Sequence, residues 1–386
     1  MSLRIGFVYH FDDRAWQGGR NYFSSLFSAV RAAADDSIEL VLLTGRRTET
    51  TLGEQFPFLQ VRRTPLLDRG HPLWALRQLS RLPSSQRHDP VLGRWIERQN
   101  IDLLSHSYPL RTRDSRVKLL GWVPDFQFVH LPALWDARAL VRAQRDCERI
   151  CRESDALVLS SHAALADLQR FAPWYNRPAH VLHFVSAPSA SRDLRTLASL
   201  QEEHDLPARY LHLPNQFWTH KNHQLVVDAL AILKAQGSEV SVVCTGATVD
   251  VRRPNHFQKL MQHCHARGVA DRFRVLGMVP YEDVCALMTH AHAVINPSRF
   301  EGWSSTVEEA RTMGKQLLLS DIAVHREQAP AGTLFFGVDD PLALAAAMHA
   351  AWTRDRVEVA PGDLERDFRA RLHRFGQSYL QIARGI

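Results

Sequence analysis

The feature that most constrains the fold is a series of short runs rich in Val, Ile and Leu, separated by longer stretches with helical periodicity. Near-continuous apolar runs are typical of strands buried on both faces of a parallel sheet, and their alternation with helices indicates βαβ units. The runs predict strands at 5–10, 39–45, 101–107, 117–123, 156–160, 180–185, 210–214, 240–246, 273–279, 293–296, 316–321 and 333–338. The sequence therefore predicts an α/β fold with two doubly wound, Rossmann-like domains.

Two domains also agree with the length, because 386 residues exceed what one hydrophobic core usually serves. A change of composition at 187–207, first rich in Ala, Ser and Pro and then charged, is typical of a linker. We expect an N-terminal domain at 1–186, a C-terminal domain at 208–362, and a final helix at 363–386 that packs back on the first domain. Ligands of such folds bind at the carboxyl ends of the strands, so we expect a site in a cleft between the two sheets.

Composition restricts the class of protein. The apolar share of 45% and the charged share of 23% are those of an ordinary soluble globular protein, and no apolar run reaches the length of a membrane span. The amino terminus begins with a strand-like run, so we expect no signal peptide. Five cysteines without a CxxC motif are typical of a reducing compartment, so we expect a cytoplasmic protein.

The net charge of +6 is carried largely by arginine, with local groups near 62–69 and 138–152. Such groups form solvated faces, or they attract an anionic substrate or the inner surface of a membrane, and the sequence leaves these alternatives open. No nucleic-acid-binding motif is present, so we expect no nucleic-acid partner. The arginine- and proline-rich residues 46–100 are expected to be partly loop.

The most informative segment joins a strand to a helix at 296–314, with the sequence NPSRFEGWSSTVEEARTMG. Pro297 cannot donate to a sheet ladder and is expected to end the strand. Ser305, followed three residues later by Glu308, predicts a capping box in which the two side chains satisfy free amides of the first helical turn. This gives Glu308 a structural role and leaves Glu309 for another purpose.

Glu301 and Glu309 lie on either side of this predicted helix start. A carboxylate can accept two hydrogen bonds from a vicinal diol, which sugars and riboses both offer. The first turn, with Ser304, Ser305 and Thr306, has free amides and a positive dipole end that suit a diphosphate. The arrangement fits a nucleotide sugar. From the residues alone, an acidic turn that only stabilises the helix dipole remains the alternative.

With these glutamates the sequence resembles the retaining GT-B glycosyltransferases grouped as family 4, which share an E-x7-E pattern. The resemblance extends to Pro-Ser-x-Phe-Glu-Gly at 297–302 and to the Gly-Lys…Ser-Asp-Ile…His-Arg-Glu segment at 314–327. It implies a GT-B fold in which Glu301 faces the transferred sugar and Glu309 holds the ribose. We expect Gly302 and Trp303 to lie against the same donor.

A second candidate element, PNQFWTHKNH at 214–223, follows the first strand of the second domain. Lys221, at the start of the next helix, is placed to stabilise the charge of a leaving diphosphate. The family usually adds an arginine several residues earlier, but Asn215 and Gln216 stand about where it is expected. Either a neutral group replaces that arginine, or Arg299 or another arginine does.

The first domain supplies further candidates. Gly18 and Gly19 are expected in a loop before a helix at 23–34, where they allow a close approach to donor phosphates or acceptor, although a plain turn fits as well. In the family a histidine of this domain lines the reaction site. The candidates for that role are Asp125, His130 and His106, in that order, with an ordinary core or surface histidine as the alternative.

Two strand ends of the second domain complete the predicted donor site. Family members present backbone to the base at the position of Met278 and Val279, and Gly246 ends a neighbouring strand. No Asp-x-Asp pair follows a strand, and His263 and His265 diverge on their helix, so we expect no metal and no other cofactor.

The resemblance thus implies a retaining glycosyltransferase that moves a sugar from a nucleotide-sugar donor to a glycan or lipid-linked acceptor, and we expect the transfer to be metal-independent. In the family such enzymes act in the synthesis of cell-surface polysaccharides. The alternatives are a GT-B enzyme that epimerises or hydrolyses a nucleotide sugar, and a non-catalytic protein that only binds one. A nicotinamide dehydrogenase is disfavoured because the G-x-G-x-x-G fingerprint is missing.

Overall fold

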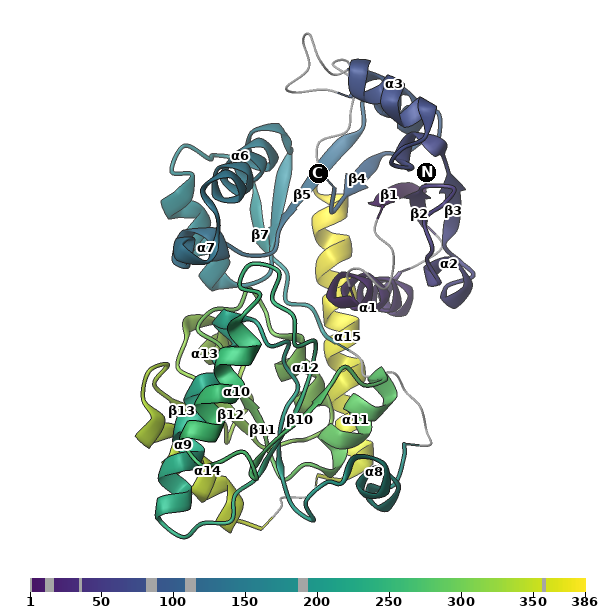
Figure 1. The fold of residues 1–386 in the computed structure, drawn as a ribbon. Coiled ribbons are helices and arrows are strands. Elements are labelled where there is room, and N and C mark those ends of the chain that lie inside the picture. Colours follow the sequence, from purple (N-terminus) through teal and green to yellow (C-terminus); the bar gives the residue numbers. More distant parts are fainter. Residues whose placement is uncertain are drawn as a thin grey trace. The chain divides into compact units, whose positions relative to one another are not determined.

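The computed structural model describes residues 2–10, 17–34, 37–80, 89–107, 116–186, 194–355 and 359–386. The chain divides into two compact units. The first comprises Met1–Phe126, Ala137–Val185 and Ala370–Ile386, and the second comprises Gln127–Asp136 and Ser186–Arg369. Each unit contains one parallel sheet flanked by helices (Figure 1), which confirms the predicted α/β class.

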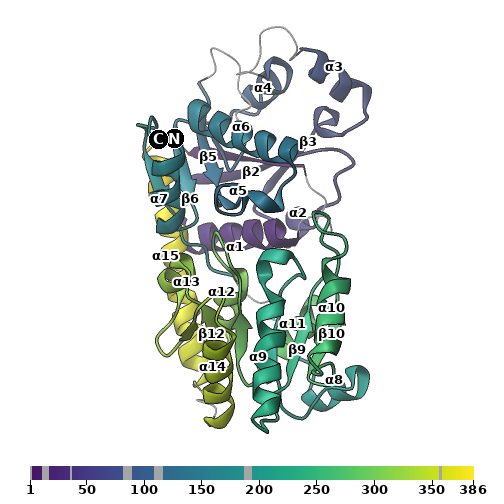
Figure 2. The ribbon, with the colours of Figure 1, turned by 60° about the vertical axis from the view of Figure 1, so that its left-hand side comes forward.

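The first unit has a seven-stranded sheet in the order β3-β2-β1-β4-β5-β6-β7, counted over the described residues. Its strands are β1 (Leu3–Tyr9), β2 (Ile38–Thr44), β3 (Gln60–Arg63), β4 (Leu103–Ser105), β5 (Lys118–Val123), β6 (Ala156–Leu159) and β7 (Ala179–Val181). The chain reverses its direction across the sheet after β3. Right-handed crossovers therefore place α1 (Gln17–Ala33) on one face, and α4 (Pro90–Glu97) and α6 (Ala137–Glu153) on the other (Figure 2).

The described parts of the segment 46–100, which the sequence predicted to be partly loop, contain several short elements. These are α2 (Leu52–Gln55), β3, η1 (Pro65–Leu67), α3 (Pro72–Ser80) and α4. The unpredicted strand β3 lies at the sheet edge and is only half buried, with both of its arginines exposed. Its pattern is not apolar enough to be recognised as a buried strand.

The second unit has a six-stranded sheet in the order β10-β9-β8-β11-β12-β13 within the described parts. Its strands are β8 (Leu211–Leu213), β9 (Val242–Thr245), β10 (Phe273–Gly277), β11 (Val294–Asn296), β12 (Leu317–Ser320) and β13 (Leu334–Phe336). Its helices are α8 (Leu197–His204), α9 (His223–Ala235), α10 (His256–Ala266), α11 (Tyr281–His290), α12 (Ser305–Thr312), α13 (Ala323–Gln328) and α14 (Pro341–Thr353), with the short η3 (Thr219–Lys221) before α9. Each strand predicted for this half is present.

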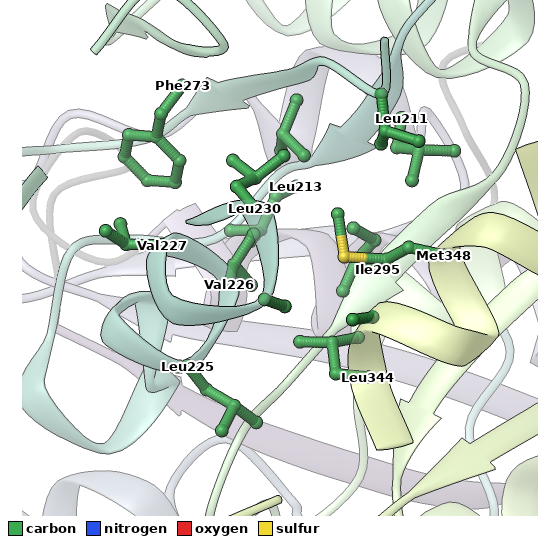
Figure 3. Close-up of a cluster of buried hydrophobic side chains, with 14 of the residues drawn as sticks. Leu211, Leu213, Leu225, Val226, Val227, Leu230, Phe273, Ile295, Leu344 and Met348 are labelled. Carbon is green, nitrogen blue, oxygen red and sulfur yellow. The ribbon is translucent and has the colours of Figure 1, made fainter. Parts of the chain in front are cut away.

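One core of the second unit lies between its sheet and helices α9, α10 and α14 (Figure 3). Leu213 and Ile295 of the sheet face Leu230 of α9 and Met348 of α14, and all four side chains are fully buried. Two smaller clusters cover the opposite face of the sheet beneath α8, α11 and α12. Burial on both faces explains why the strands read as continuous apolar runs.

Two segments depart from the expected domain boundaries. The second unit includes α5 (Gln127–His130) and η2 (Pro132–Leu134), although both follow β5 in the chain. The chain then returns to the first unit, which includes α7 (His162–Phe171) between β6 and β7. Helix α15 (Pro361–Arg384) begins in the second unit, and its residues from Ala370 onward belong to the first. The first part of the expected linker, 187–193, lies outside the described residues. Among the described helices, none has the length and apolar composition to cross a membrane.

Candidate functional site

A buried asparagine organises the carboxyl end of strand β11. Asn296 is fully buried, and its Oδ1 accepts hydrogen bonds from Asn215 at 3.1 Å and from the hydroxyl of Ser298 at 2.6 Å. Its Nδ2 donates to Ser304 Oγ at 2.9 Å and reaches Glu301 Oε1 at 3.5 Å. One side chain thus fixes the loop that carries the first glutamate and the start of the following helix. The sequence analysis did not identify Asn296, although a polar residue that ends an apolar strand is a signal for such a role.

Glu301 forms a buried ion pair with Lys221. The distance from Lys221 Nζ to Glu301 Oε1 is 2.5 Å, and the side chains are 13% and 10% exposed. Burial by itself would raise the pKa of Glu301, but Lys221, His325 and a hydrogen bond from Ser298 lower this pKa to about 2. The structure therefore holds one ionised carboxylate and one ammonium group side by side, where η3 and the loop after β11 meet.

A histidine of the His-Arg-Glu segment, which was not predicted as a site residue, lies close enough to influence this pair. His325 of α13 is fully buried, and its Nδ1 donates to the carbonyl of Ser320 at 2.9 Å. Its Nε2 is buried and has no hydrogen-bond partner among the described residues. Burial lowers the pKa of His325, although the charge of Glu301 opposes that shift. His325 is therefore neutral at neutral pH, and its bare ring nitrogen can accept a hydrogen bond.

The predicted capping box at the start of α12 is wrong by one residue. The N-cap is Ser304, which has an extended backbone, and its hydroxyl accepts from the amide of Val307 at 3.4 Å. Glu308 does not reach back to cap the helix, because its carboxylate accepts from the amide of Gln328 at 3.1 Å. Gln328 also pairs with the backbone of Ser304 in both directions, at 2.7 and 3.1 Å. A tertiary contact therefore selects the cap residue, and Ser305 becomes the first residue of the helix.

The first turn of α12 retains unsatisfied donors. Within the described residues, the amides of Ser305 and Thr306 have no acceptor. The hydroxyl of Thr306 donates to Asn215 Oδ1 at 3.3 Å, which ties this turn to the end of β8. Free amides and the helix dipole favour a bound anion at this point. Lys221 adds a positive charge that is joined to the same loop through Glu301.

Glu309 is buried on α12 in a different environment. Its Oε1 accepts hydrogen bonds from the hydroxyl of Tyr281 at 2.8 Å and from the hydroxyl of Ser186 at 3.2 Å. Burial raises the pKa of Glu309 to about 7, and the two hydroxyl donors oppose this shift. A carboxylate oxygen that accepts from two hydroxyls has the hydrogen-bonding capacity for a pair of sugar hydroxyls. No local pattern pointed to Tyr281 or Ser186, because neither is near Glu309 in the chain.

The residues that stand in place of the expected arginine have structural partners. Gln216 Oε1 accepts from the amide of Ala247 at 2.6 Å, and Asn215 bonds to Asn296 and Thr306. Gly246 has φ 141°, and a Cβ there would lie 2.4 Å from the carbonyl oxygen of Asn215. Glycine is therefore needed for close packing of these two strand ends.

The remaining donor-site candidates of the second unit surround the same sheet edge with different exposure. Arg299 is 39% exposed and pairs with Asp339 at 2.5 Å, so its guanidinium is already occupied by a carboxylate. Met278 is 59% exposed after β10, whereas Val279 packs against a core cluster. Gly302 and Trp303 are partly buried beside Glu301.

The first unit places Gly18 and Gly19 differently from the sequence prediction. Both lie in the first turn of α1, which begins at Gln17, and not in a loop before a helix at 23–34. Gly18 is exposed, and among the described residues nothing lies within 4 Å of a Cβ built on it. The glycines are therefore helical residues near the carboxyl end of β1.

His106 belongs to a buried aromatic cluster of the first unit. Its backbone is left-handed, with φ 55°, just beyond β4. The Nε2 atom lies 2.6 Å from the hydroxyl of Tyr22, and Nδ1 lies 2.7 Å from the hydroxyl of Ser105. Burial lowers the pKa of His106 to about 3, so the ring is neutral. Tyr22 also stacks on Trp122, with ring centroids 4.5 Å apart.

The other two first-half candidates fall in separate units. Asp125 is partly buried in the first unit. The pKa of the nearby Cys147 thiol is raised by the hydrogen bond that this thiol donates to Cys151, by burial, and by neighbouring charges that include Asp125. His130 belongs to the second unit, and its ring centroid lies 5.1 Å from that of Phe300, next to Glu301. Of the three candidates, His130 is the one that the second unit brings beside the glutamate loop.

The loop after β9 holds the segment of His130 in place. Arg252 donates to Gln127 Oε1 at 2.7 Å and lies over the ring of Trp135, 5.2 Å from its centroid. Arg253 donates to the carbonyl of Ala133. Three contacts therefore fasten residues 127–136 to the second unit.

Comparisons with known proteins bear on the family and on the fold. Residues 201–359 match the family described as glycosyl transferases group 1. The fold resembles sucrose-phosphate synthase from Thermosynechococcus elongatus (16% identity, 99% of this chain and 98% of that chain, TM-score 0.69). It also resembles Anabaena HepE in complex with UDP and glucose (15%, 99% of each chain, 0.65). A third similar structure is an α,α-trehalose-phosphate synthase (UDP-forming) from Burkholderia xenovorans with glucose-6-phosphate (12%, 100% of each chain, 0.65). No curated protein is significantly similar in sequence.

Proposed function

We propose that this chain, a glycosyltransferase with the GT-B fold, transfers a sugar from a nucleotide-sugar donor with retention of anomeric configuration and without a metal ion. The observation that carries the proposal is the combination of two differently tuned glutamates with one helix start. Ionised Glu301 beside Lys221 is suited to a sugar and its leaving phosphate. The buried Glu309 is suited to a ribose diol.

In the proposed complex the diphosphate lies at the start of α12. Its oxygens accept from the free amides of Ser305 and Thr306, and Lys221 turns from Glu301 toward the developing negative charge. Glu301 then accepts hydrogen bonds from hydroxyls of the transferred sugar. The ribose hydroxyls replace those of Tyr281 and Ser186 on Glu309.

The transfer step needs no enzyme nucleophile. The bond from the anomeric carbon to the phosphate oxygen breaks, and the acceptor oxygen forms a bond to the same face of that carbon. The acceptor proton passes to the leaving phosphate. The chain contributes orientation and charge stabilisation, and Lys221 supplies the positive charge that balances the leaving group. We further propose a glycan or lipid-linked acceptor used in cell-surface polysaccharide synthesis in the cytoplasm.

The test compares Glu301→Gln and Lys221→Met with Lys234→Met, a control lysine on the same unit. Lys234 pairs with Asp271 at 3.0 Å and is 40% exposed, so its loss leaves the site intact. With the nucleotide sugar that stabilises the protein most in a thermal-shift panel, both site variants are expected to lower kcat by about 100-fold or more. The control is expected to retain full activity.

Removing one partner of a buried pair destabilises a protein, so folding has to be separated from catalysis. The double variant Lys221→Met/Glu301→Gln removes both charges and is expected to fold better than either single variant while remaining inactive. Wild-type transfer rates in any of the three variants would overturn the assignment. Product analysis by NMR shows whether the anomeric configuration is retained, and it distinguishes transfer from hydrolysis or epimerisation. Repeating the assay after chelation of metal ions tests whether transfer is metal-independent.

A further inference from the structure

The surface of the first unit carries a line of arginines that the proposed reaction does not use. Helix α6 has Arg138, Arg142, Arg145, Arg149 and Arg152, spaced by four, three, four and three residues. At 100° per residue this spacing confines them to an arc of about 80°, over a length of about 21 Å. The buried Cys147 and Cys151 lie on the opposite side of the helix, so the side of α6 that carries the arginines faces away from the core.

Most of these arginines have no acidic partner. Arg138, Arg142 and Arg145 are exposed, and among the described residues no carboxylate forms an ion pair with any of them. Arg149 pairs with Glu153 at 3.3 Å within the helix. Like charges along one helix face repel each other, because residues three and four apart are neighbours. An anionic partner would relieve this repulsion.

Two exposed apolar side chains flank the arginine stripe, which we define as Arg138, Arg142, Arg145, Arg149 and Arg152. Val141, between the first arginines, is 42% exposed, and Trp174, in the same unit, is 41% exposed. The guanidinium of Arg152 lies 4.1 Å from the centroid of the Trp174 ring. Tryptophan and arginine together are typical of side chains that enter the headgroup region of a bilayer.

We propose that the arginine stripe docks the first unit on an anionic membrane surface through lipid phosphates. A straight row of charges on one rigid helix suits a flat array of phosphates, and Val141 and Trp174 can reach the boundary of the acyl chains. A soluble polyanion would use the arginines and gain little from the apolar pair. The proposed docking depends on the proposed function in one respect, because its role would be to give the enzyme access to a lipid-linked acceptor.

The experiment is co-sedimentation of the full chain with vesicles of phosphatidylcholine containing phosphatidylglycerol, and with vesicles of phosphatidylcholine alone. We expect the wild type to bind only the anionic vesicles and to dissociate as salt is added. Each basic residue at an anionic surface contributes about fivefold to the partition coefficient, so Arg142→Gln/Arg145→Gln is expected to reduce this coefficient by roughly 30-fold.

The matched control is Arg366→Gln/Arg369→Gln, which removes the same net charge from exposed positions of α15 in the second unit. This variant is expected to bind vesicles within about twofold of the wild type, because its arginines already pair with Asp363 and Glu365. Nucleotide-sugar binding, measured without vesicles, is expected to be unchanged in both variants. Failure of docking is thereby distinguished from failure of the proposed function.

Three outcomes would overturn the proposal. The first is equal loss of binding in the stripe variant and the control. The second is absence of wild-type binding to anionic vesicles, including the case in which heparin, a soluble polyanion, binds instead. The third is loss of vesicle binding only in Leu76→Ser/Leu79→Ser, which would assign the membrane contact to the exposed leucines of α3.

Discussion

At the scale of single residues, the two glutamates of the E-x7-E pattern differ in charge because of their neighbours. Glu301 has a cation 2.5 Å away, which keeps its pKa near 2 despite burial. Glu309 has only hydroxyl donors, so burial dominates and brings its pKa to about 7. Equal side chains eight residues apart thus favour different protonation states, because Glu301 has a cationic neighbour and Glu309 has hydroxyl donors alone.

The raised pKa of Glu309 predicts a pH dependence of stability. Between its ordinary value of 4.5 and about 7, the folded chain holds a proton that the unfolded chain has lost, so stability falls as pH rises through this window. Glu309→Gln lacks this ionisation. Its stability relative to the wild type is therefore expected to increase by about 3 kcal/mol across the window.

Urea unfolding of both proteins at several pH values measures this difference. The comparison is made above the ordinary pKa of glutamate, because protonation of Glu301 destabilises the wild type and the variant alike below it. A constant difference across the window would contradict the assigned environment of Glu309.

At the scale of elements, helix α12 depends on one serine for two contacts. Ser304 Oγ accepts from the amide of Val307 and from Asn296 Nδ2. Ser305 makes no such bond among the described residues, and its side chain is partly exposed. The helix start, and with it the free amides of the site, are thus held by the cap and by the fully buried Asn296.

This arrangement predicts different effects for two neighbouring serines. Ser304→Ala removes the cap and leaves a buried amide donor of Asn296 without its partner, so it is expected to cost about 2 kcal/mol. Ser305→Ala is expected to change stability by less than about 0.5 kcal/mol. Chemical denaturation of the two variants measures their loss of stability. An equal loss for the two variants, or a larger loss for Ser305→Ala, would support the capping box that the sequence predicted.

At the scale of the whole molecule, the C-terminal part of the last helix, α15, packs against the first strand and the first helix of the chain. The residues of α15 from Ala370 onward belong to the first unit, where the ring of Tyr379 packs 6.3 Å from that of Phe7 in β1. Gly376 lies against α1 so closely that a Cβ would be 2.0 Å from the carbonyl oxygen of Ala29. The first unit therefore cannot reach its final packing until the last helix has been made.

A glycine pair within α15 tests this packing. Gly376→Ala is expected to destabilise the first unit by about 1–3 kcal/mol, because backbone must move to admit the methyl group. Gly362→Ala, in the same helix, has no described atom within 4 Å of its Cβ and is expected to be neutral or slightly stabilising. Thermal unfolding measures both, and a Gly376 variant as stable as the Gly362 variant would show that α15 does not pack as described.

The features that could be predicted from the amino-acid sequence are those that depend on local pattern. Among the described strands, apolar runs predicted all but β3, because most of these strands are largely apolar, whereas β3 is an edge strand that ends in two exposed arginines. Glu301, Glu309 and Lys221 could be selected because strand, loop and helix start are contiguous in the chain around each of them. The same local reasoning gave the α/β class.

Which side chains meet across the site depends on contacts between residues that are far apart in the chain. Tyr281 and Ser186 lie 28 and 123 residues from Glu309, and Gln328 reaches back 24 residues to choose Ser304 as the cap. Residues 127–136 join the second unit through contacts with Arg252 and Arg253. Such pairings leave no periodic trace in the sequence, because burial and hydrogen-bond geometry select them only after the sheets have formed.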